Sequence, residues 1–226
     1  MPIADPNCRL CNGNGWIEVD ENGKPTEKSD MVIPCPCVAK VQNKKALEKS
    51  GLEKTSNRMT FETYEANDQY TKYIKEKAVD NSIVDNWWFI GGTSGSGKTH
   101  ISRAICDKLI NKGYKVLSID WTEQSTRLKA IVNDKEYLPL INKLKKIEVL
   151  YIDDLFKAKY TAADIKLLYE IVNFRYNNNL KTLISSEYTL GEITSIDEAI
   201  GSRIYEQCDG YCINTSDLKN HRLIKG

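Results

Sequence analysis

The sequence has almost no net charge, because 32 lysine and arginine residues balance 31 aspartate and glutamate residues among its 226 positions. This balance excludes a uniformly basic protein that coats nucleic acid, so any contact with DNA must use a local basic face. No apolar run approaches the roughly 20 residues that a bilayer-spanning helix needs, and the first residues lack the basic start and apolar stretch of a secretion signal. We therefore expect a cytoplasmic protein that does not contact membranes.

Cysteine is unevenly distributed along the chain. Four of the seven cysteines lie within the first forty residues. In a reducing cytoplasm these thiols are not expected to form disulfides, so their clustering needs another explanation. The chain is longer than one minimal module and too short for two full-size domains. We predict a small N-terminal unit joined to one principal domain, whose apolar fraction of 41% suffices for a sizeable core.

The sign of the charge changes after the cysteine cluster. Residues 1–37 carry three basic and six acidic side chains, whereas residues 38–60 carry six basic and two acidic ones. This change indicates a boundary, followed by a basic helix that runs from about residue 38 to residue 50 and ends at Gly51. The predicted organisation is a cysteine module over residues 1–40, a basic helical linker over residues 41–60 and the principal domain over residues 61–226.

The principal domain alternates short apolar runs with helical patterns. Strands are predicted at residues 87–90, 116–119, 149–152, 182–184 and 211–213. Helical periodicity is present at residues 101–109 and 165–172, and the second helix follows a capping pair formed by Thr161 and Asp164. Strands that are almost continuously apolar are buried on both faces. The predicted fold class is therefore α/β, with a mainly parallel sheet flanked by helices.

A phosphate-binding motif lies between the first strand of this domain and the helix after it. It matches the Walker A pattern throughout, and its residues are Gly92, Thr93, Ser94, Gly95, Ser96, Gly97, Lys98 and Thr99. The glycines let backbone N–H groups surround phosphate oxygens beside the positive end of the helix. Lys98 is expected to contact the β- and γ-phosphates, and the Thr99 hydroxyl to hold Mg²⁺. The alternative, a flexible turn, does not explain why strand and helix flank it.

Two carboxylates follow the strand at residues 149–152. Asp153 is expected to hold Mg²⁺ through water, and Asp154 to polarise the water that attacks the γ-phosphate. The alternative is a strand that simply ends in an acidic turn. Together with the phosphate motif, the pair predicts ATP and Mg²⁺ as ligands and ATP hydrolysis as the activity.

These motifs, in this order, resemble those of the bacterial and phage helicase loaders of the DnaC/DnaI type, which are AAA+ ATPases alongside the initiator DnaA. The resemblance spans roughly residues 58–224, and it rests on residues 91–100, 151–155, 171–176, 184–188, 201–204 and 219–222. It implies an AAA+ P-loop domain with weak ATPase activity that self-associates through this domain. It also implies that His100 belongs to the nucleotide site, and that the segment from Arg58 to Phe61 flanks the adenine.

The resemblance also implies roles for two arginines. Arg203 is the candidate arginine finger, which acts on the γ-phosphate bound by a neighbouring subunit, because a planar guanidinium spreads its charge over several oxygens. Arg222 corresponds to the sensor-2 arginine, which acts on the nucleotide of its own subunit. The alternatives are a helix-surface arginine paired with Glu206 in the first case, and a solvated charge in the second.

The sensor-1 position differs from that of the family. A polar asparagine is common there, whereas this chain has Glu187 on or beside the position. A carboxylate repels the γ-phosphate unless it is protonated, paired or turned away. We expect Ser185 or Ser186 to supply the hydrogen bond instead, and we expect slow hydrolysis more than weak binding.

The clustered cysteines form two close pairs, Cys8 with Cys11 and Cys35 with Cys37. Four thiolates in two clips suit a structural zinc site, and zinc would supply much of the folding energy of so short a segment. A redox dithiol at the first pair is an alternative without the thioredoxin-type strand and helix around it. Unliganded core cysteines are the other alternative. In the loaders the N-terminal domain binds the hexameric replicative helicase, which is the role that the resemblance implies for residues 1–40.

The segment from residue 122 to residue 146 is locally basic. It has three acidic side chains against six basic ones, which are Arg127, Lys129, Lys135, Lys143, Lys145 and Lys146. In initiator-like ATPases the corresponding insertion lines a path for single-stranded DNA, and lysines suit phosphate contacts. A solvated helix face explains the same pattern, and both interpretations stay open.

The function that these observations favour is ATP-dependent loading of the replicative helicase onto single-stranded DNA. An IstB-like ATPase that regulates DNA transposition is the main alternative, and the cysteine module favours the loader over it. A zinc-dependent adaptor with a purely structural ATP site is a third hypothesis. The intact set of Lys98, Thr99, Asp153 and Asp154 argues against this adaptor.

Overall fold

A computed structural model describes residues 4–20, 22, 24–26, 31–52, 59–157 and 159–218. The chain divides into two compact units, Met1–Lys49 and Ser50–Gly226. The predicted boundary after residue 40 falls within a helix of the first unit, so the cysteine module and most of that helix belong together. Among the described residues, no helix combines the length and the apolar character that crossing a membrane requires.

The first unit consists of a hairpin and one helix. Strand β1 (Trp16–Glu18) pairs antiparallel with β2 (Val32–Pro34), and α1 (Pro36–Ser50) follows at once. The basic helix expected from residue 38 is therefore confirmed, with an earlier start at a proline. Proline suits the first turn of a helix because its φ is fixed and its missing N–H would have no helical partner. The small core contains Ile17, Val19 and Val38 beside three of the cysteines.

The second unit is built on a five-stranded parallel sheet with the strand order β4-β5-β6-β3-β7. The strands are β3 (Trp88–Gly91), β4 (Val116–Asp120), β5 (Val149–Leu155), β6 (Thr182–Ser186) and β7 (Cys212–Asn214). All five predicted strands are thus confirmed. The inner strands β3 and β6 are buried along their whole length, as expected for a sheet covered on both faces.

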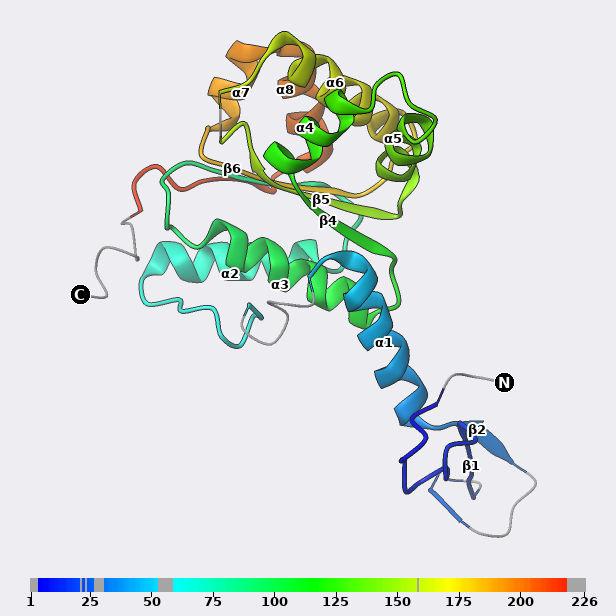
Figure 1. The fold of residues 1–226 in the computed structure, drawn as a ribbon. Helices are drawn as coiled ribbons and strands as arrows, with labels where there is room; N and C mark the ends of the chain where they lie inside the picture. Colours follow the sequence, from blue (N-terminus) through cyan, green and yellow to red (C-terminus); the bar gives the residue numbers. More distant parts are fainter. Residues whose placement is uncertain are drawn as a thin grey trace. The chain divides into compact units, whose positions relative to one another are not determined.

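Helices cover both faces of this sheet (Figure 1). One face carries α2 (Gln69–Asn81) and α3 (Lys98–Asn111). The other carries α4 (Trp121–Ala130), α5 (Tyr137–Lys146), α6 (Ala162–Asn177), α7 (Leu190–Ile196) and α8 (Glu198–Cys208). Helix α6 begins with the predicted capping box, in which Thr161 and Asp164 bond each other's backbone N–H. The predicted α/β fold class is confirmed.

Two buried cations bind the carbonyl groups at the ends of helices. The Arg175 guanidinium donates to the carbonyl oxygens of Leu144 at 3.0 Å and Ile147 at 2.8 Å, where α5 ends. The Lys181 ammonium donates to the carbonyl oxygen of Asn81 at 2.8 Å, where α2 ends. Helix C-termini leave carbonyl groups without helical partners, and a cation near them is favourable. These contacts join the end of α5 to α6, and the end of α2 to the residue before β6.

The parallel arrangement brings the functional motifs to one edge. The phosphate loop follows β3, the paired carboxylates end β5, and the serines of the sensor-1 region end β6. Gly91 lies opposite Ser186, and Leu155 also lies opposite Ser186 from the other side. In open α/β sheets, ligands bind at the carboxyl ends of the strands. The site is therefore expected at this edge.

Candidate functional site

The phosphate loop depends on glycines at two close approaches. Gly92 has a φ of 119°, and a Cβ atom there would lie 2.6 Å from the backbone nitrogen of Ser216. Gly97 has a φ of 91° at the N-cap of α3, where a Cβ would meet the Tyr64 ring at 3.2 Å. Only glycine adopts these backbone angles without strain. The loop therefore turns tightly into the N-terminus of α3, where N–H groups and the helix dipole favour an anion.

Lys98 and the residues after β7 brace this loop. The buried Lys98 ammonium donates to the carbonyl oxygens of Gly92 at 2.8 Å and Thr93 at 2.7 Å. The Thr93 hydroxyl donates to the carbonyl oxygen of Ser216 at 2.9 Å, and the Ser96 hydroxyl donates to the side-chain hydroxyl of Thr215 at 3.0 Å. Sequence reasoning missed this last segment. The sequence signal that could have identified this segment is the pair of hydroxyl residues, Thr215 and Ser216, directly after the last strand.

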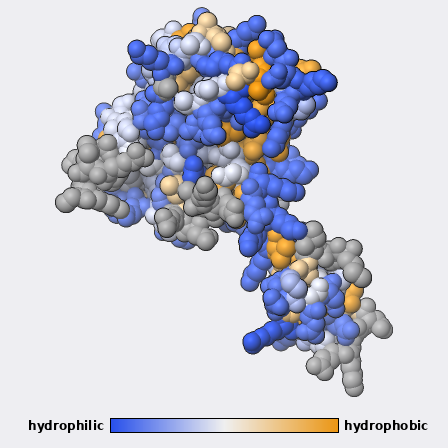
Figure 2. All heavy atoms as spheres, in the orientation of Figure 1, coloured by the Kyte–Doolittle hydropathy of each residue, from blue (hydrophilic) through white to orange (hydrophobic). Residues whose placement is uncertain are grey.

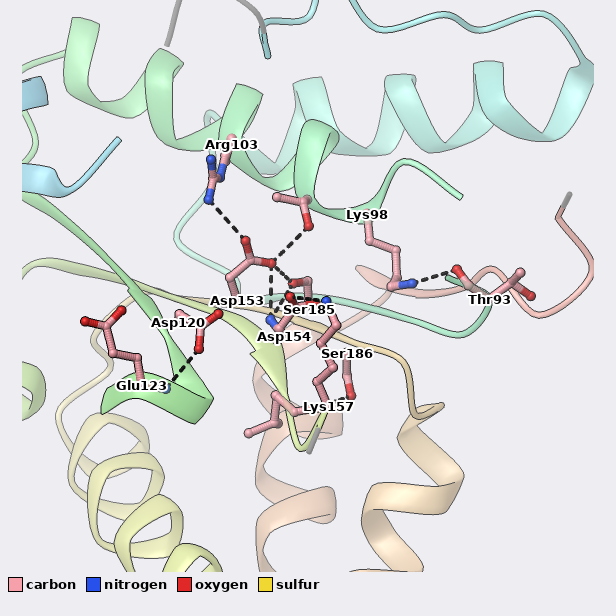
Figure 3. A network of polar contacts seen from close by, with 12 residues as sticks. Thr93, Lys98, Arg103, Asp120, Glu123, Asp153, Asp154, Lys157, Ser185 and Ser186 are labelled. Carbon is pink, nitrogen blue, oxygen red and sulfur yellow. Dashed lines mark hydrogen bonds and ion pairs between the residues drawn. The ribbon is translucent and has the colours of Figure 1, made fainter. Parts of the chain in front are cut away.

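Asp153 is the centre of a polar network beneath the loop (Figure 3). Its carboxylate accepts hydrogen bonds from the hydroxyls of Thr99 at 3.1 Å, Tyr151 at 2.7 Å and Ser185 at 2.5 Å. Arg103 forms an ion pair with it at 3.4 Å. Burial and the adjacent Asp153 raise the pKa of Tyr151 well above its ordinary value, so the phenol keeps the proton that it donates.

The Thr99 hydroxyl and the Asp153 carboxylate fit Mg²⁺. They are hard oxygen donors next to a phosphate-binding loop, the kind of ligand set that Mg²⁺ accepts together with waters and phosphate oxygens. When bound, the ion neutralises charge on the β- and γ-phosphates. The structure thus brings the two predicted magnesium residues together, and the three further partners of Asp153 fix the direction of its carboxylate.

Asp154 differs from Asp153 in its surroundings. Asp154 has a φ of 54° and lies within a register shift between β5 and β6. Its side chain is only partly buried and forms an ion pair of 2.7 Å with Lys157. Asp154 and Lys157 line one pocket together with Lys98 and Thr99. The predicted water-polarising carboxylate therefore faces the phosphate loop.

Glu187 also lines this pocket. The two serines before it point elsewhere, since Ser185 donates to Asp153 and Ser186 donates to the carbonyl oxygen of Leu155 at 2.7 Å. Both hydroxyls are buried. Direct contact of either serine with phosphate stays a prediction. In this structure both hydroxyls donate to oxygen atoms of the protein. Of these three neighbouring residues, Glu187 is the one that lines the pocket, and it is exposed.

His100 ties the start of α3 to the segment expected to flank the adenine. Burial lowers the pKa of His100, so the ring is neutral near pH 7 and its Nε2–H donates to the carbonyl oxygen of Thr60 at 3.0 Å. The Tyr64 ring meets the imidazole edge-on, with centroids 5.4 Å apart. Met59 lines the pocket, whereas Arg58 lies outside the described residues.

Of the two arginines assigned by resemblance, the structure describes Arg203 but not Arg222. Arg203 lies on α8, where it donates to the side-chain oxygen of Asn173 at 3.1 Å and lies over the rings of Tyr169 and Tyr176. It does not line the pocket around Lys98, so action on a neighbouring subunit stays a prediction. Arg222 lies outside the described residues, and its role also stays a prediction.

The four clustered cysteines of the first unit meet in space. Their sulfur atoms all lie within 4.8 Å of one another, with 3.7 Å between Cys8 and Cys35 and 3.5 Å between Cys11 and Cys37. A tetrahedron with zinc–sulfur bonds of about 2.3 Å has sulfur–sulfur edges of about 3.8 Å, so the four sulfurs fit zinc. Disulfide bonds are far shorter. Backbone N–H groups of Leu10 and Cys11 lower the pKa of Cys8 to about 7, which favours the thiolate.

The basic segment after β4 forms the predicted helices α4 and α5. Two of its six basic side chains form ion pairs with acidic residues of α6. Lys129 pairs with Asp164 at 2.7 Å, and Lys145 pairs with Glu170 at 2.5 Å. These two lysines contribute to helix packing. The proposed contact of this segment with DNA stays a prediction, and the remaining candidates are Arg127, Lys135, Lys143 and Lys146.

A phosphate loop after a central strand, with a magnesium-binding carboxylate at the end of a nearby strand, defines a P-loop ATPase of the AAA+ class. Residues 39–220 match the family model of the IstB-like ATP binding protein, and the chain belongs to this family.

Individual relatives agree with this assignment. The phage-like element PBSX protein XkdC of Bacillus subtilis (strain 168) is 31% identical over 237 residues, covering 96% of this chain and 86% of the relative. The crystal structure of the DnaC helicase loader has a TM-score of 0.63 at 22% identity, over 68% of this chain and 96% of that one. The structure of DnaI has a TM-score of 0.60 at 19% identity, over 71% and 92%. These solved structures share the fold.

Proposed function

We propose that the chain is an ATP-controlled loader, which places a hexameric replicative helicase on single-stranded DNA in the cytoplasm. The observation that carries the proposal is the presence, on one chain, of a pocket lined by the phosphate loop and of a separate four-thiol unit. An ATPase that only turns over nucleotide has no need of such a unit. A loader needs one part that holds the helicase and another that controls release.

The small unit has the surface of a binding module. Leu10, Trp16 and Val32 are 61%, 43% and 56% exposed, and all three border the same hollow. Hydrophobic residues also reach the surface of this unit in Figure 2. Exposed apolar side chains that gather in one place mark interaction sites. Zinc, bound by the four thiolates, would hold the hairpin that carries Trp16 and Val32 and the turn that carries Leu10.

The relatives support the same assignment. One structural neighbour is named a helicase loader, and a sequence relative is encoded by a phage-like element. Single-stranded DNA would contact the basic segment of α4 and α5, and self-association would bring Arg203 to the nucleotide of the next subunit. Weak hydrolysis would then switch the chain between holding and releasing the helicase.

Co-purification tests this proposal. The tagged chain is expected to retain purified replicative helicase, with the retained amount depending on ATP. Trp16→Ala should lose the helicase but keep its metal and ATP binding. Ile83→Ala removes an apolar side chain that is 67% exposed on the other unit, and it should behave like the parent. Absence of helicase retention, both with and without ATP, would refute the loader proposal.

Regulation of DNA transposition is the second candidate, because the family description is that of an IstB-like protein. Under this alternative the chain retains a transposase and stimulates strand transfer, and the helicase is not retained. The same co-purification with both partners therefore separates the two candidates. ATP binding is common to both and does not distinguish them.

A further inference from the structure

The turn after β5 holds one lysine against the candidate water-polarising carboxylate. The backbone N–H of Lys157 donates to the carbonyl oxygen of Asp154 at 3.1 Å, which closes a tight turn. Across this turn the Lys157 ammonium contacts the Asp154 carboxylate at 2.7 Å. Both side chains line the pocket of the phosphate loop, and Figure 3 shows Lys157 and Asp154 among the labelled residues of the polar network.

The turn is anchored at some conformational cost. Asp154 and Phe156 have φ values of 54° and 59°, in the left-handed region that side chains other than glycine disfavour. Phe156 is 2% exposed and packs edge-on against Trp121, and Leu155 is fully buried. Such backbone persists only where its surroundings enforce it, and it concentrates at functional sites. Here its consequence is that residues 154 and 157 both face the pocket.

The charged groups that line the pocket indicate a role for Lys157. Lys98 donates into the loop, and the anionic groups nearby are Asp153, Asp154 and Glu187. A γ-phosphate that enters this pocket meets Glu187, a like charge that disfavours it. The pocket-lining cations are Lys98 and Lys157 within the described part of the chain. The Lys157 ammonium contacts the Asp154 carboxylate there.

We propose that Lys157 is a γ-phosphate-contacting residue, whose ammonium exchanges the Asp154 carboxylate for the terminal phosphate when ATP binds. The exchange offsets the charge of Glu187 and frees the Asp154 carboxylate to accept a hydrogen bond from water. ADP has no γ-phosphate, so with ADP the Lys157–Asp154 pair persists. Lys157 thereby makes the site distinguish ATP from ADP. The inference rests on nucleotide binding at the phosphate loop and is independent of the helicase partner.

Binding of a non-hydrolysable ATP analogue and of ADP, measured by calorimetry with Mg²⁺, tests the proposal. Lys157→Met keeps the aliphatic stem and removes the charge. One charge-assisted hydrogen bond corresponds to a loss of about tenfold or more in affinity. We expect that loss for the ATP analogue and unchanged affinity for ADP. Lys157→Arg should retain most of the preference for the analogue.

Lys159→Met is the matched control, because Lys159 is an exposed lysine two residues further on. It should bind both nucleotides like the parent. Equal losses for the analogue and ADP in Lys157→Met would show a structural role of the turn and overturn the proposal, as would no loss at all. If the parent chain binds neither nucleotide, the ATP site itself is refuted together with this inference.

A double variant separates direct contact from action through Asp154. If Lys157 contacts the phosphate, Lys157→Met should still lower affinity for the ATP analogue when Asp154→Asn is present. Disappearance of the effect in the Asp154→Asn background would show that Lys157 acts only on its carboxylate partner, and this would overturn the proposal. The 45% exposure of the Lys157 side chain makes the substitution compatible with folding.

Discussion

The two units of the chain bury very different amounts of apolar surface. The cluster in Met1–Lys49 contains six buried residues, three of which are cysteines, whereas the main cluster of Ser50–Gly226 contains twenty. Burial of apolar area is the dominant favourable contribution to folding, so the larger unit needs no metal to fold. The described residues of the smaller unit form no comparable core, and four of its thiols lie at zinc-binding distances. The two units would thus draw on different sources of stability, apolar burial in the second and metal binding in the first.

Removing the metal is expected to give the largest difference between the units. Structural zinc binding contributes on the order of 10 kcal/mol or more in small domains. Chelation, or Cys35→Ser, should therefore unfold residues 16–38 and leave the second unit folded. Amide signals in a two-dimensional NMR spectrum report both units at once: those of the first should collapse into the unfolded range, while those of the second keep their positions.

Cys106→Ser is the control for this experiment, because Cys106 is a buried cysteine of the second unit. It should leave the metal content unchanged. If the first unit kept dispersed amide signals after complete chelation, its fold would rest on its apolar cluster, and the contrast between the two units would be lost.

Nucleotide is expected to affect the units in the opposite way. At a free concentration about a hundred times its dissociation constant, ATP with Mg²⁺ should stabilise the second unit by about 2.7 kcal/mol and leave the first unchanged. Lys98→Ala should abolish this stabilisation, because it removes the ammonium next to the phosphate loop. Thermal unfolding followed separately for each unit measures the effect.

Lys108→Ala is the matched control, since Lys108 is exposed on the same helix and away from the pocket. It should respond to ATP like the parent chain. Stabilisation that survives in Lys98→Ala would place the nucleotide elsewhere and contradict the site described here.

The sequence was sufficient for features that depend on neighbouring residues. The phosphate loop, the pair of carboxylates near the end of β5 and the capping box of α6 all follow from local spacing, and the structure contains each of them. The parallel sheet then brings the ends of β3, β5 and β6 to one edge. Because this rule holds for any parallel sheet, the site could be assembled before its geometry was known.

Features that depend on distant contacts could not be predicted. The roles of Arg175 and Lys181 follow from where α5 and α2 end, which no local pattern specifies. The turn that pairs Lys157 with Asp154 contains a left-handed phenylalanine, a conformation that sequence propensities disfavour. Ser185, one of the two serines expected to bond phosphate, donates to Asp153, a contact that depends on the pairing of β5 with β6.

The smallest expected effect concerns Asp164, which caps α6 of the second unit. Burial opposes its charge, but hydrogen bonds from Lys129 and Thr161 hold the pKa of Asp164 to about 2, below its unfolded value of 3.8. Because the folded pKa is the lower one, the unfolded state binds the extra proton. The stabilisation is therefore complete above about pH 4 and is lost as the pH falls towards 2.

Asp164→Asn should accordingly lower the free energy of unfolding by about 1–2 kcal/mol at pH 7, the range of a lost cap with a buried partner charge. The difference between parent and variant should shrink steadily when urea unfolding is repeated from pH 5 down to pH 3. Glu192→Gln changes the equivalent capping carboxylate of α7, which is exposed, and should cost less. A difference that stayed constant with pH would mean that Asp164 stabilises α6 through its shape and hydrogen bonds, with no contribution from its charge.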